Sequence, residues 1–89
     1  MRRTVQRKQF RADVKRQKRR GKNIEELVAV VGLLVEEGVL PPAYAAHKLS
    51  GPWSGVWECH IEPDWLLIYT VADEEVLLIR TGTHADLFN

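Results

Sequence analysis

The sequence predicts an α+β fold in which two N-terminal helices pack on one face of a small antiparallel sheet. Three observations support this prediction: a basic helical pattern over residues 8–20, an apolar helical pattern over residues 24–37, and three β-type segments after Gly55. Helices followed by a run of strands are typical of α+β proteins. We expect the element order βααβββ in a single domain covering residues 1–89.

The N-terminal region predicts a short strand over residues 4–6 and then the first helix. Phe10 and Val14 are spaced four apart in a polar run that contains no glycine or proline before Gly21. This spacing places both apolar side chains on one helical face. Gly21 is suited to the left-handed position that ends many helices.

The second helix has the strongest signals in the sequence. Asn23, followed by Glu26 three residues later, resembles an N-terminal capping box. Gly38 provides the C-terminal signal, and Pro41 and Pro42 block any continuation. Apolar residues recur at the spacing of one buried face, at positions 24, 27, 28, 31, 34 and 35.

The second half of the chain predicts a loop and then three strands. We expect loop from residue 39 through His47 to Gly55, and strands over residues 56–61, 65–71 and 76–80. The short polar turns between the strands favour an antiparallel meander. Residues 81–89 are expected to form a polar tail. With both helices on one face, the other face of the sheet is left for a ligand.

Charge is distributed unevenly along the chain. Residues 1–22 contain eleven bases and one acid, Asp13, a balance of +10, whereas residues 23–89 contain two bases and eleven acids, a balance of −9. Such asymmetry predicts a polyanionic partner, either nucleic acid or an acidic protein. The candidate docking residues lie on and just before the first helix: Arg7, Lys8, Arg11, Lys15, Arg16, Lys18, Arg19 and Arg20.

Several classes of function are disfavoured. The apolar runs are far shorter than the roughly 18 residues of a membrane span, and no apolar segment of a secretion signal follows the basic start. The single cysteine fits a reducing cytoplasm. His60, Glu62 and Asp64 offer ligand atoms for a metal, but their pattern is more typical of solvated surface, so we expect no metal site and no cofactor.

Histidines are the side chains that best suggest catalysis. His47, His60 and His84 each lie beside an expected turn or strand end, and histidine can both remove and deliver a proton near neutral pH. Arg80 is an isolated cation that either binds a phosphate or pairs with a nearby acid. Phe88 either stacks on an exposed base or holds the tail down. The sequence leaves both alternatives open.

Three segments together resemble a known family. They are His47-Lys-Leu-Ser-Gly-Pro-Trp53, His60-Ile-Glu-Pro-Asp-Trp65-Leu-Leu-Ile-Tyr69 and Arg80-Thr-Gly-Thr-His84-Ala-Asp-Leu-Phe88. In order and spacing they are similar to the YafQ branch of the RelE-type toxins, the toxin halves of bacterial type II toxin–antitoxin pairs. The resemblance covers essentially the whole chain, and the helical half matches by pattern only.

The resemblance implies a RelE-like fold and a ribosome-dependent, metal-independent endoribonuclease that cuts mRNA in the ribosomal A site. His47, His60, Asp64 and His84 would be the acid–base and orienting set, with Arg80 on the scissile phosphate and Phe88 positioning the mRNA. One assignment makes His60 the base and His84 the acid, but the sequence does not fix the direction. The alternative function is a non-catalytic RNA- or ribosome-binding module that uses the basic helix.

The resemblance also implies partners. A cognate antitoxin with an acidic segment would cover the toxin, and the basic helix would meet either that segment or ribosomal RNA. A monomeric free toxin is compatible with this scheme, which requires no membrane.

Overall fold

The computed structural model of this protein describes residues 1–88 and contains three α-helices, five strands and two short 3-10 turns. None of the helices in that range is long and apolar enough to cross a membrane. The strands are Arg3–Gln6 (β1), His47–Lys48 (β2), Trp57–Glu62 (β3), Trp65–Val71 (β4) and Glu75–Gly82 (β5). The helices are Lys8–Arg19 (α1), Ile24–Glu37 (α2) and His84–Phe88 (α3), and the turns are Pro42–Tyr44 and Gly51–Trp53. The predicted α+β class is confirmed.

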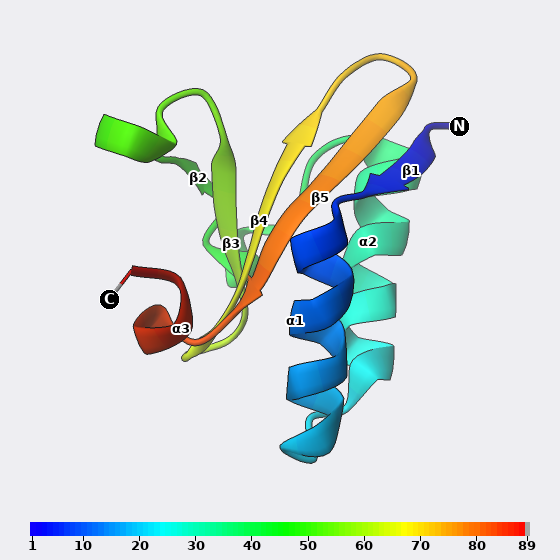
Figure 1. The fold of residues 1–89 in the computed structure, drawn as a ribbon. Coiled ribbons are helices and arrows are strands. Elements are labelled where there is room, and N and C mark those ends of the chain that lie inside the picture. Colours follow the sequence, from blue (N-terminus) through cyan, green and yellow to red (C-terminus); the bar gives the residue numbers. More distant parts are fainter. Residues whose placement is uncertain (89) are drawn as a thin grey trace.

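The five strands form one sheet in the order β1-β5-β4-β3-β2 (Figure 1). Strands β3 to β5 form the expected antiparallel meander, and β2, which was not expected, pairs antiparallel with β3. The expectation of a wholly antiparallel sheet is wrong for β1, which runs parallel to β5 with Arg3 opposite Glu75. Parallel neighbours need a long crossover connection, and the whole chain between β1 and β5 provides it.

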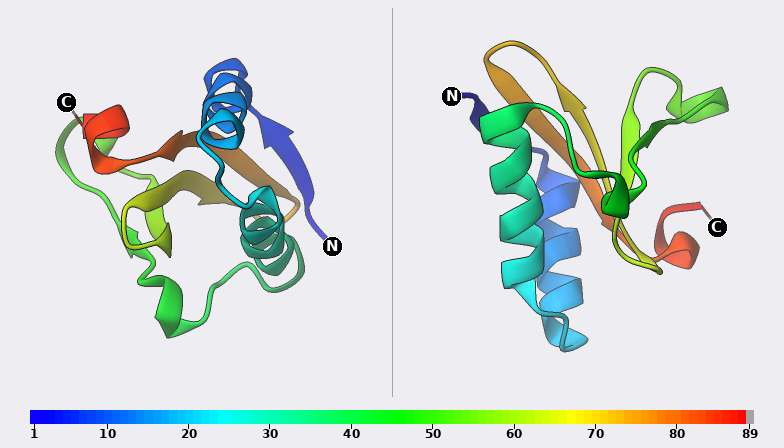
Figure 2. Two further views of the ribbon diagram at one scale, coloured as in Figure 1. Left: turned by 90° about the horizontal axis from the view of Figure 1, so that it is seen from below. Right: turned by 180° about the vertical axis from the view of Figure 1, so that it is seen from behind.

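Both long helices cover the same face of the sheet, as predicted (Figures 1 and 2). Leu27, Val30 and Leu34 of α2 are buried in one cluster with Trp65, Leu67, Tyr69, Val76 and Leu78 of the sheet. Asn23 caps α2, but its side chain accepts from the N–H of Glu25 rather than that of Glu26. Gly38 ends the helix at φ +75°, in the left-handed region.

Helix α1 buries a mixed face. Phe10 is buried and Val14 packs against the same core, as the spacing predicts. Asp13 and Gln17 are buried beside them, at 1% and 0% exposure. Burying polar groups is unfavourable unless they are hydrogen-bonded, so both residues must have partners elsewhere in the fold.

The other face of the sheet is only partly open. Leu66, Ile68 and Leu87 form a second buried cluster there, covered by Trp53 and Val56 among others. The expected polar tail is therefore wrong in part: residues 81 and 82 extend β5, and α3 follows it on the side of the sheet away from α2 (Figure 2). His47, expected in a loop, lies in the edge strand β2. Asn89 lies outside the described residues.

Candidate active site

Strand β3 carries two titratable side chains, Glu58 and His60, on the face of the sheet opposite the long helices. Successive residues of a strand alternate between faces, and Cys59 is buried in the helix-side core. Its neighbours Glu58 and His60 therefore lie on the opposite face. Across the adjacent strand, Glu58 is opposite His47 of β2.

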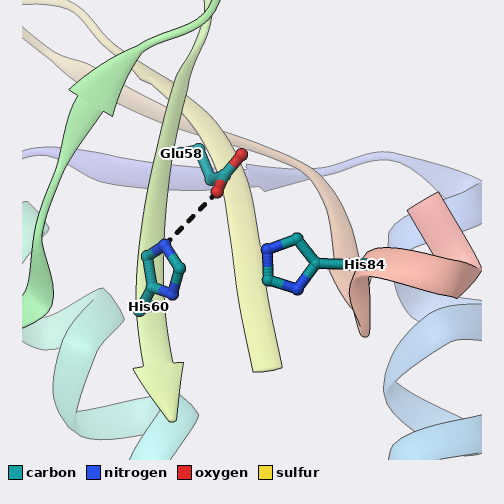
Figure 3. A group of neighbouring side chains, drawn as sticks. All are labelled: Glu58, His60 and His84. Carbon is teal, nitrogen blue, oxygen red and sulfur yellow. Dashed lines mark ion pairs between the residues drawn. The ribbon is translucent and has the colours of Figure 1, made fainter. Parts of the chain in front are cut away.

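The three histidines form a row that ends at Phe88. The ring centroids of His47 and His60 are 6.4 Å apart, those of His60 and His84 are 5.8 Å apart, and those of His84 and Phe88 are 6.5 Å apart. Figure 3 shows His60 on β3 facing His84 at the start of α3, with Glu58 beside both. The structure thus brings together four of the predicted site residues from β2, β3 and α3.

Asp64 fixes the orientation of His84. Its Oδ1 accepts from the backbone N–H of His84 at 2.9 Å and lies 2.6 Å from Nδ1 of the ring. These two bonds from His84 hold the pKa of Asp64 below its usual range. Because an ionised carboxylate can only accept, Nδ1 must carry a proton, which leaves Nε2 as the nitrogen of His84 that can contact a ligand.

Glu58 was missed in the sequence, and it lies between His47 and His60. One oxygen, Oε1, is 3.5 Å from Nε2 of His60 and 3.9 Å from Nε2 of His47, and the side chain is 7% exposed. On the far side of the His60 ring, Nδ1 is 3.3 Å from the carbonyl oxygen of Pro63. The signal that could have found Glu58 is its spacing, since a residue two positions before His60 shares its strand face.

Arg80 of β5 lies in register with Glu58 on the same face of the sheet, but its guanidinium is bound by an acid of α1. It is opposite Ile68 of β4, which in turn is opposite Glu58, so these three residues form one row across the sheet. Its Nε and Nη2 donate to the two carboxylate oxygens of Asp13 at 2.6 and 3.2 Å. The backbone N–H of Thr81 also donates to Asp13, at 3.1 Å. Arg80 therefore pairs with an acid, though with the distant Asp13 rather than a local one.

Two aromatic residues of the motifs have different surroundings. Phe88 is 41% exposed and meets Trp53 edge to face, with ring centroids 6.0 Å apart. Trp65 is fully buried, and its Nε1 donates to Oγ1 of Thr81 at 3.0 Å. Phe88 is thus accessible to a ligand, whereas Trp65 supports the sheet.

Glu58, His60 and His84 each offer one donor atom within 4.8 Å of one another, and these are donor types that transition metals accept. The possible metal-ligand set named from the sequence, His60, Glu62 and Asp64, is not assembled in residues 1–88. Glu62 pairs with Lys22 at 2.8 Å, and Asp64 bonds to His84.

The candidate docking bases differ in exposure and in their contacts. Arg16 is half-buried, and the other seven are exposed: Arg7, Lys8, Arg11, Lys15, Lys18, Arg19 and Arg20. Arg20 makes a two-pronged ion pair with Asp86 of α3, at 2.6 and 3.1 Å, and Arg16 lies 3.7 Å from the same carboxylate. Two of the eight bases are thus ion-paired within the protein, and Arg11 donates from Nη1 to the carbonyl oxygen of Gln6 at 3.0 Å.

The fold and the row of histidines define a small α+β protein with a cluster of titratable side chains on the partly open face of its sheet. The sequence model described as bacterial toxin of type II toxin-antitoxin system, YafQ, matches residues 2–89, and the chain belongs to this family.

Three relatives illustrate the similarity. The mRNA interferase toxin YafQ of Escherichia coli strain K12 is 42% identical over 81 residues, covering 90% of this chain and 88% of that protein. The toxin in the crystal structure of the E. coli DinJ-YafQ complex is 39% identical, with a TM-score of 0.90 and full coverage of both chains. The metal-bound toxin from Helicobacter pylori is 36% identical, with a TM-score of 0.89 and coverage of 99% and 100%.

Proposed function

We propose that this chain is an mRNA interferase: an endoribonuclease that cuts mRNA on the ribosome, in the A site, by attack of a ribose 2′-OH on the adjacent phosphate. The observation that carries the proposal is the row of His47, His60 and His84 with two ordered carboxylates beside it. Its E. coli relative is named as an mRNA interferase. The reaction needs a base for the 2′-OH, a cation for the charge on the phosphate, and an acid for the leaving 5′-oxygen.

We assign the base to His84. Asp64 lies 2.6 Å from Nδ1 of that ring, so Nδ1 carries the proton in the neutral ring and Nε2 is the nitrogen with a free lone pair. This is the arrangement in which a carboxylate orients a histidine base and stabilises the cation formed when it takes a proton. Nε2 of His84 would then accept the proton of the 2′-OH.

We assign the acid to His60. Both ring nitrogens lie beside acceptors, Nε2 at 3.5 Å from Glu58 and Nδ1 at 3.3 Å from the carbonyl of Pro63. Only the doubly protonated ring offers a proton to each of them. This direction is the reverse of the assignment considered from the sequence, and His47, beside the same carboxylate, would help to orient the substrate.

Arg80 and Phe88 complete the proposed site. Asp13 occupies Nε and Nη2 of Arg80, so Nη1 is the nitrogen from which Arg80 would bind the scissile phosphate. Phe88 would stack on a base of the mRNA, because its ring is exposed and Trp53 supports it edge-on.

Single-turnover cleavage of mRNA on programmed ribosomes tests the reaction. His60→Ala and His84→Ala should each slow cleavage by about 10²–10⁴-fold, while Glu36→Gln, an exposed change on α2, should not. A 2′-deoxy substitution at the cleavage site should abolish cutting. The product should end in a 2′,3′-cyclic phosphate or a 3′-phosphate, and a 3′-OH end would exclude this mechanism.

A substrate with sulfur in place of the leaving 5′-oxygen tests the direction of proton transfer. Sulfur leaves without protonation, so this substrate should restore cleavage by His60→Ala but not by His84→Ala. Rescue of His84→Ala alone would reverse the two assignments.

The alternative, a non-catalytic RNA- or ribosome-binding module, depends on the exposed bases of α1. It predicts that His60→Ala and His84→Ala remain fully toxic to growing cells. It also predicts that purified protein leaves ribosome-bound mRNA uncut.

We propose two macromolecular partners for the bases of α1. The DinJ-YafQ complex of the E. coli relative supports a cognate antitoxin, whose acidic segment would cover these bases, and ribosomal RNA would occupy them in its absence. Replacing Lys15, Lys18 and Arg19 by alanine should weaken ribosome binding and reduce its salt dependence. The cleavage rate on saturated ribosomes should be unchanged.

We propose that the reaction needs no metal and that a transition ion inhibits it. Glu58, His60 and His84 would bind such an ion and lose their acid–base function, and the H. pylori relative is described as metal-bound. EDTA should leave cleavage unchanged, whereas added Cu²⁺ should inhibit it and EDTA should then restore it. Loss of activity in EDTA would indicate a catalytic metal instead.

A further inference from the structure

The side chain of Asp86 joins the two helices α1 and α3. Its carboxylate receives two bonds from Arg20, the C-cap of α1, at 2.6 and 3.1 Å, and one from Gln17 within that helix, at 3.2 Å. The backbone N–H of Thr83, in front of α3, donates to it at 2.9 Å. Although it carries a charge, the side chain is only 12% exposed, so the basic helix and the short C-terminal helix are joined through a nearly enclosed carboxylate.

Two neighbours of Asp86, Gly82 and Gln17, accommodate its carboxylate. A Cβ added at Gly82 would lie 2.8 Å from Oδ2 of Asp86, so any larger residue at position 82 would displace it. Gln17 donates its amide N–H to Asp86, while its buried Oε1 has no partner within residues 1–88. Leaving a buried acceptor unpaired is unfavourable, and the contact with Asp86 explains why Gln17 keeps this orientation.

The helix that Asp86 holds carries two of the proposed site residues. His84 is its first residue and Phe88 its last. A helix of five residues is not stable by itself, so its position depends on contacts with the rest of the protein. Leu87 packs in the second apolar cluster, and Asp86 supplies the polar contacts on the side of α1.

We propose that Asp86 is a positioning residue that clamps α3 to Arg20 and Gln17 of the basic helix, and so holds His84 and Phe88 at the active face. The basic helix would then hold α3 in place in addition to docking a partner. The kinetic consequence rests on the proposed function, but the clamp itself does not.

The clamp is tested first in the free protein, by amide hydrogen exchange. The N–H of His84 is bonded to Asp64 and that of Leu87 to the carbonyl of Thr83, so both report on α3 while neither uses Asp86 directly. In Arg20→Ala these two amides should exchange about tenfold faster, the size expected for a charge-assisted pair with one exposed partner.

Arg19→Ala is the matched control, because it removes the same charge from the neighbouring, exposed position of α1. It should leave exchange in α3 unchanged. Asp86→Asn, which can still accept from Thr83, should resemble Arg20→Ala, and the double variant should add little to either single change. Equal exchange in Arg19→Ala and Arg20→Ala, or full additivity in the double variant, would overturn the proposal.

Cleavage on ribosomes then separates positioning from docking. Arg19→Ala should weaken ribosome binding, whereas Arg20→Ala, which removes a base already held by Asp86, should weaken it less. Arg20→Ala should instead slow the single-turnover rate at saturation by about tenfold, and Glu36→Gln, an exposed change on α2, should not change that rate. Equal rates for Arg20→Ala and Glu36→Gln would refute the link to His84 even if the exchange results hold. If the wild-type protein cuts no RNA while exchange responds as expected, the proposed function fails and the clamp stands.

Discussion

Replacing Asp13 by asparagine tests how much of the fold depends on the ion pair between α1 and β5. Asp13 is 1% exposed and accepts from Nε and Nη2 of Arg80, from the N–H of Thr81 and from the amide of Gln9. Asparagine has one acceptor oxygen and turns an NH₂ group towards some of these donors. The change therefore leaves the guanidinium of Arg80 without its countercharge.

The expected loss follows from the burial of the two partners. Breaking a fully buried ion pair costs about 3–5 kcal/mol, but the Arg80 side chain is 21% exposed and water can reach part of it. We therefore expect Asp13→Asn to lower the free energy of unfolding by about 2–3 kcal/mol. For a chain of this size that corresponds to a fall in Tm of about 8–24 °C.

Urea denaturation followed by tryptophan fluorescence measures this loss, since Trp65 is fully buried and reports on unfolding. Glu36→Gln, which removes a carboxylate from an exposed position of α2, should change stability by less than about 0.5 kcal/mol. In an Arg80→Met background the cost of Asp13→Asn should fall by about half or more, because the partner is gone. A loss below about 1 kcal/mol, or an undiminished loss in that background, would refute the reasoning.

Three further predictions follow from the site and its supports. Arg20 holds the pKa of Asp86 below its usual range. Wild type should therefore exceed Asp86→Asn in free energy of unfolding by the full amount above pH about 4, and this difference should shrink as the pH falls below about 4. Urea denaturation at pH 7 and pH 3 measures it. Burial raises the pKa of the Cys59 thiol to about 12, so iodoacetamide at pH 8 should label it only after unfolding; labelling of the folded protein would contradict this. Gly82→Ala should speed amide exchange in α3 as Asp86→Asn does, because the added Cβ displaces the carboxylate; unchanged exchange would show that the carboxylate can move aside.

Elements with a local signature were predictable from the sequence. Helix α2 has an N-cap at Asn23, apolar residues at helical spacing and a glycine at its end, and it begins and ends where these signals indicate. Strand β4 was predicted with its observed bounds, Trp65–Val71. Helix α3 also has a local signal, because Thr83 and Asp86 form the Thr-x-x-Asp pattern of a capping box. In the structure the N–H of each residue donates to the side chain of the other.

Features that depend on distant pairs were not predictable. The parallel pairing of β1 with β5 is fixed by the packing of the whole chain, not by residues 3–6. The burial of Asp13 and Gln17 has no local signal, because their partners, Arg80 and Asp86, lie 67 and 69 positions away. The convergence of histidines could be expected from the motifs, whereas the carboxylate of Glu58 between two of them required the register of β2 on β3.

These long-range pairs change the meaning of the charge asymmetry. In residues 1–88, Arg16, Arg20 and Lys22 of the basic segment pair with Asp86 and Glu62 of the acidic remainder, and the one acid of the basic segment, Asp13, pairs with Arg80. Part of the opposite charge therefore joins the two parts of the chain to each other.

Bases without an ion-pair partner in that part of the chain remain along α1 and just before it: Arg7, Lys8, Arg11, Lys15, Lys18 and Arg19. These bases can exchange counterions for phosphates without breaking an ion pair within the protein. The salt dependence of ribosome binding should consequently reflect about six phosphate contacts at most, not the eleven bases counted in residues 1–22. By the proposed clamp, a polyanion that also took Arg20 from Asp86 would loosen α3, so we expect the partner that leaves the protein active to dock on the outer bases.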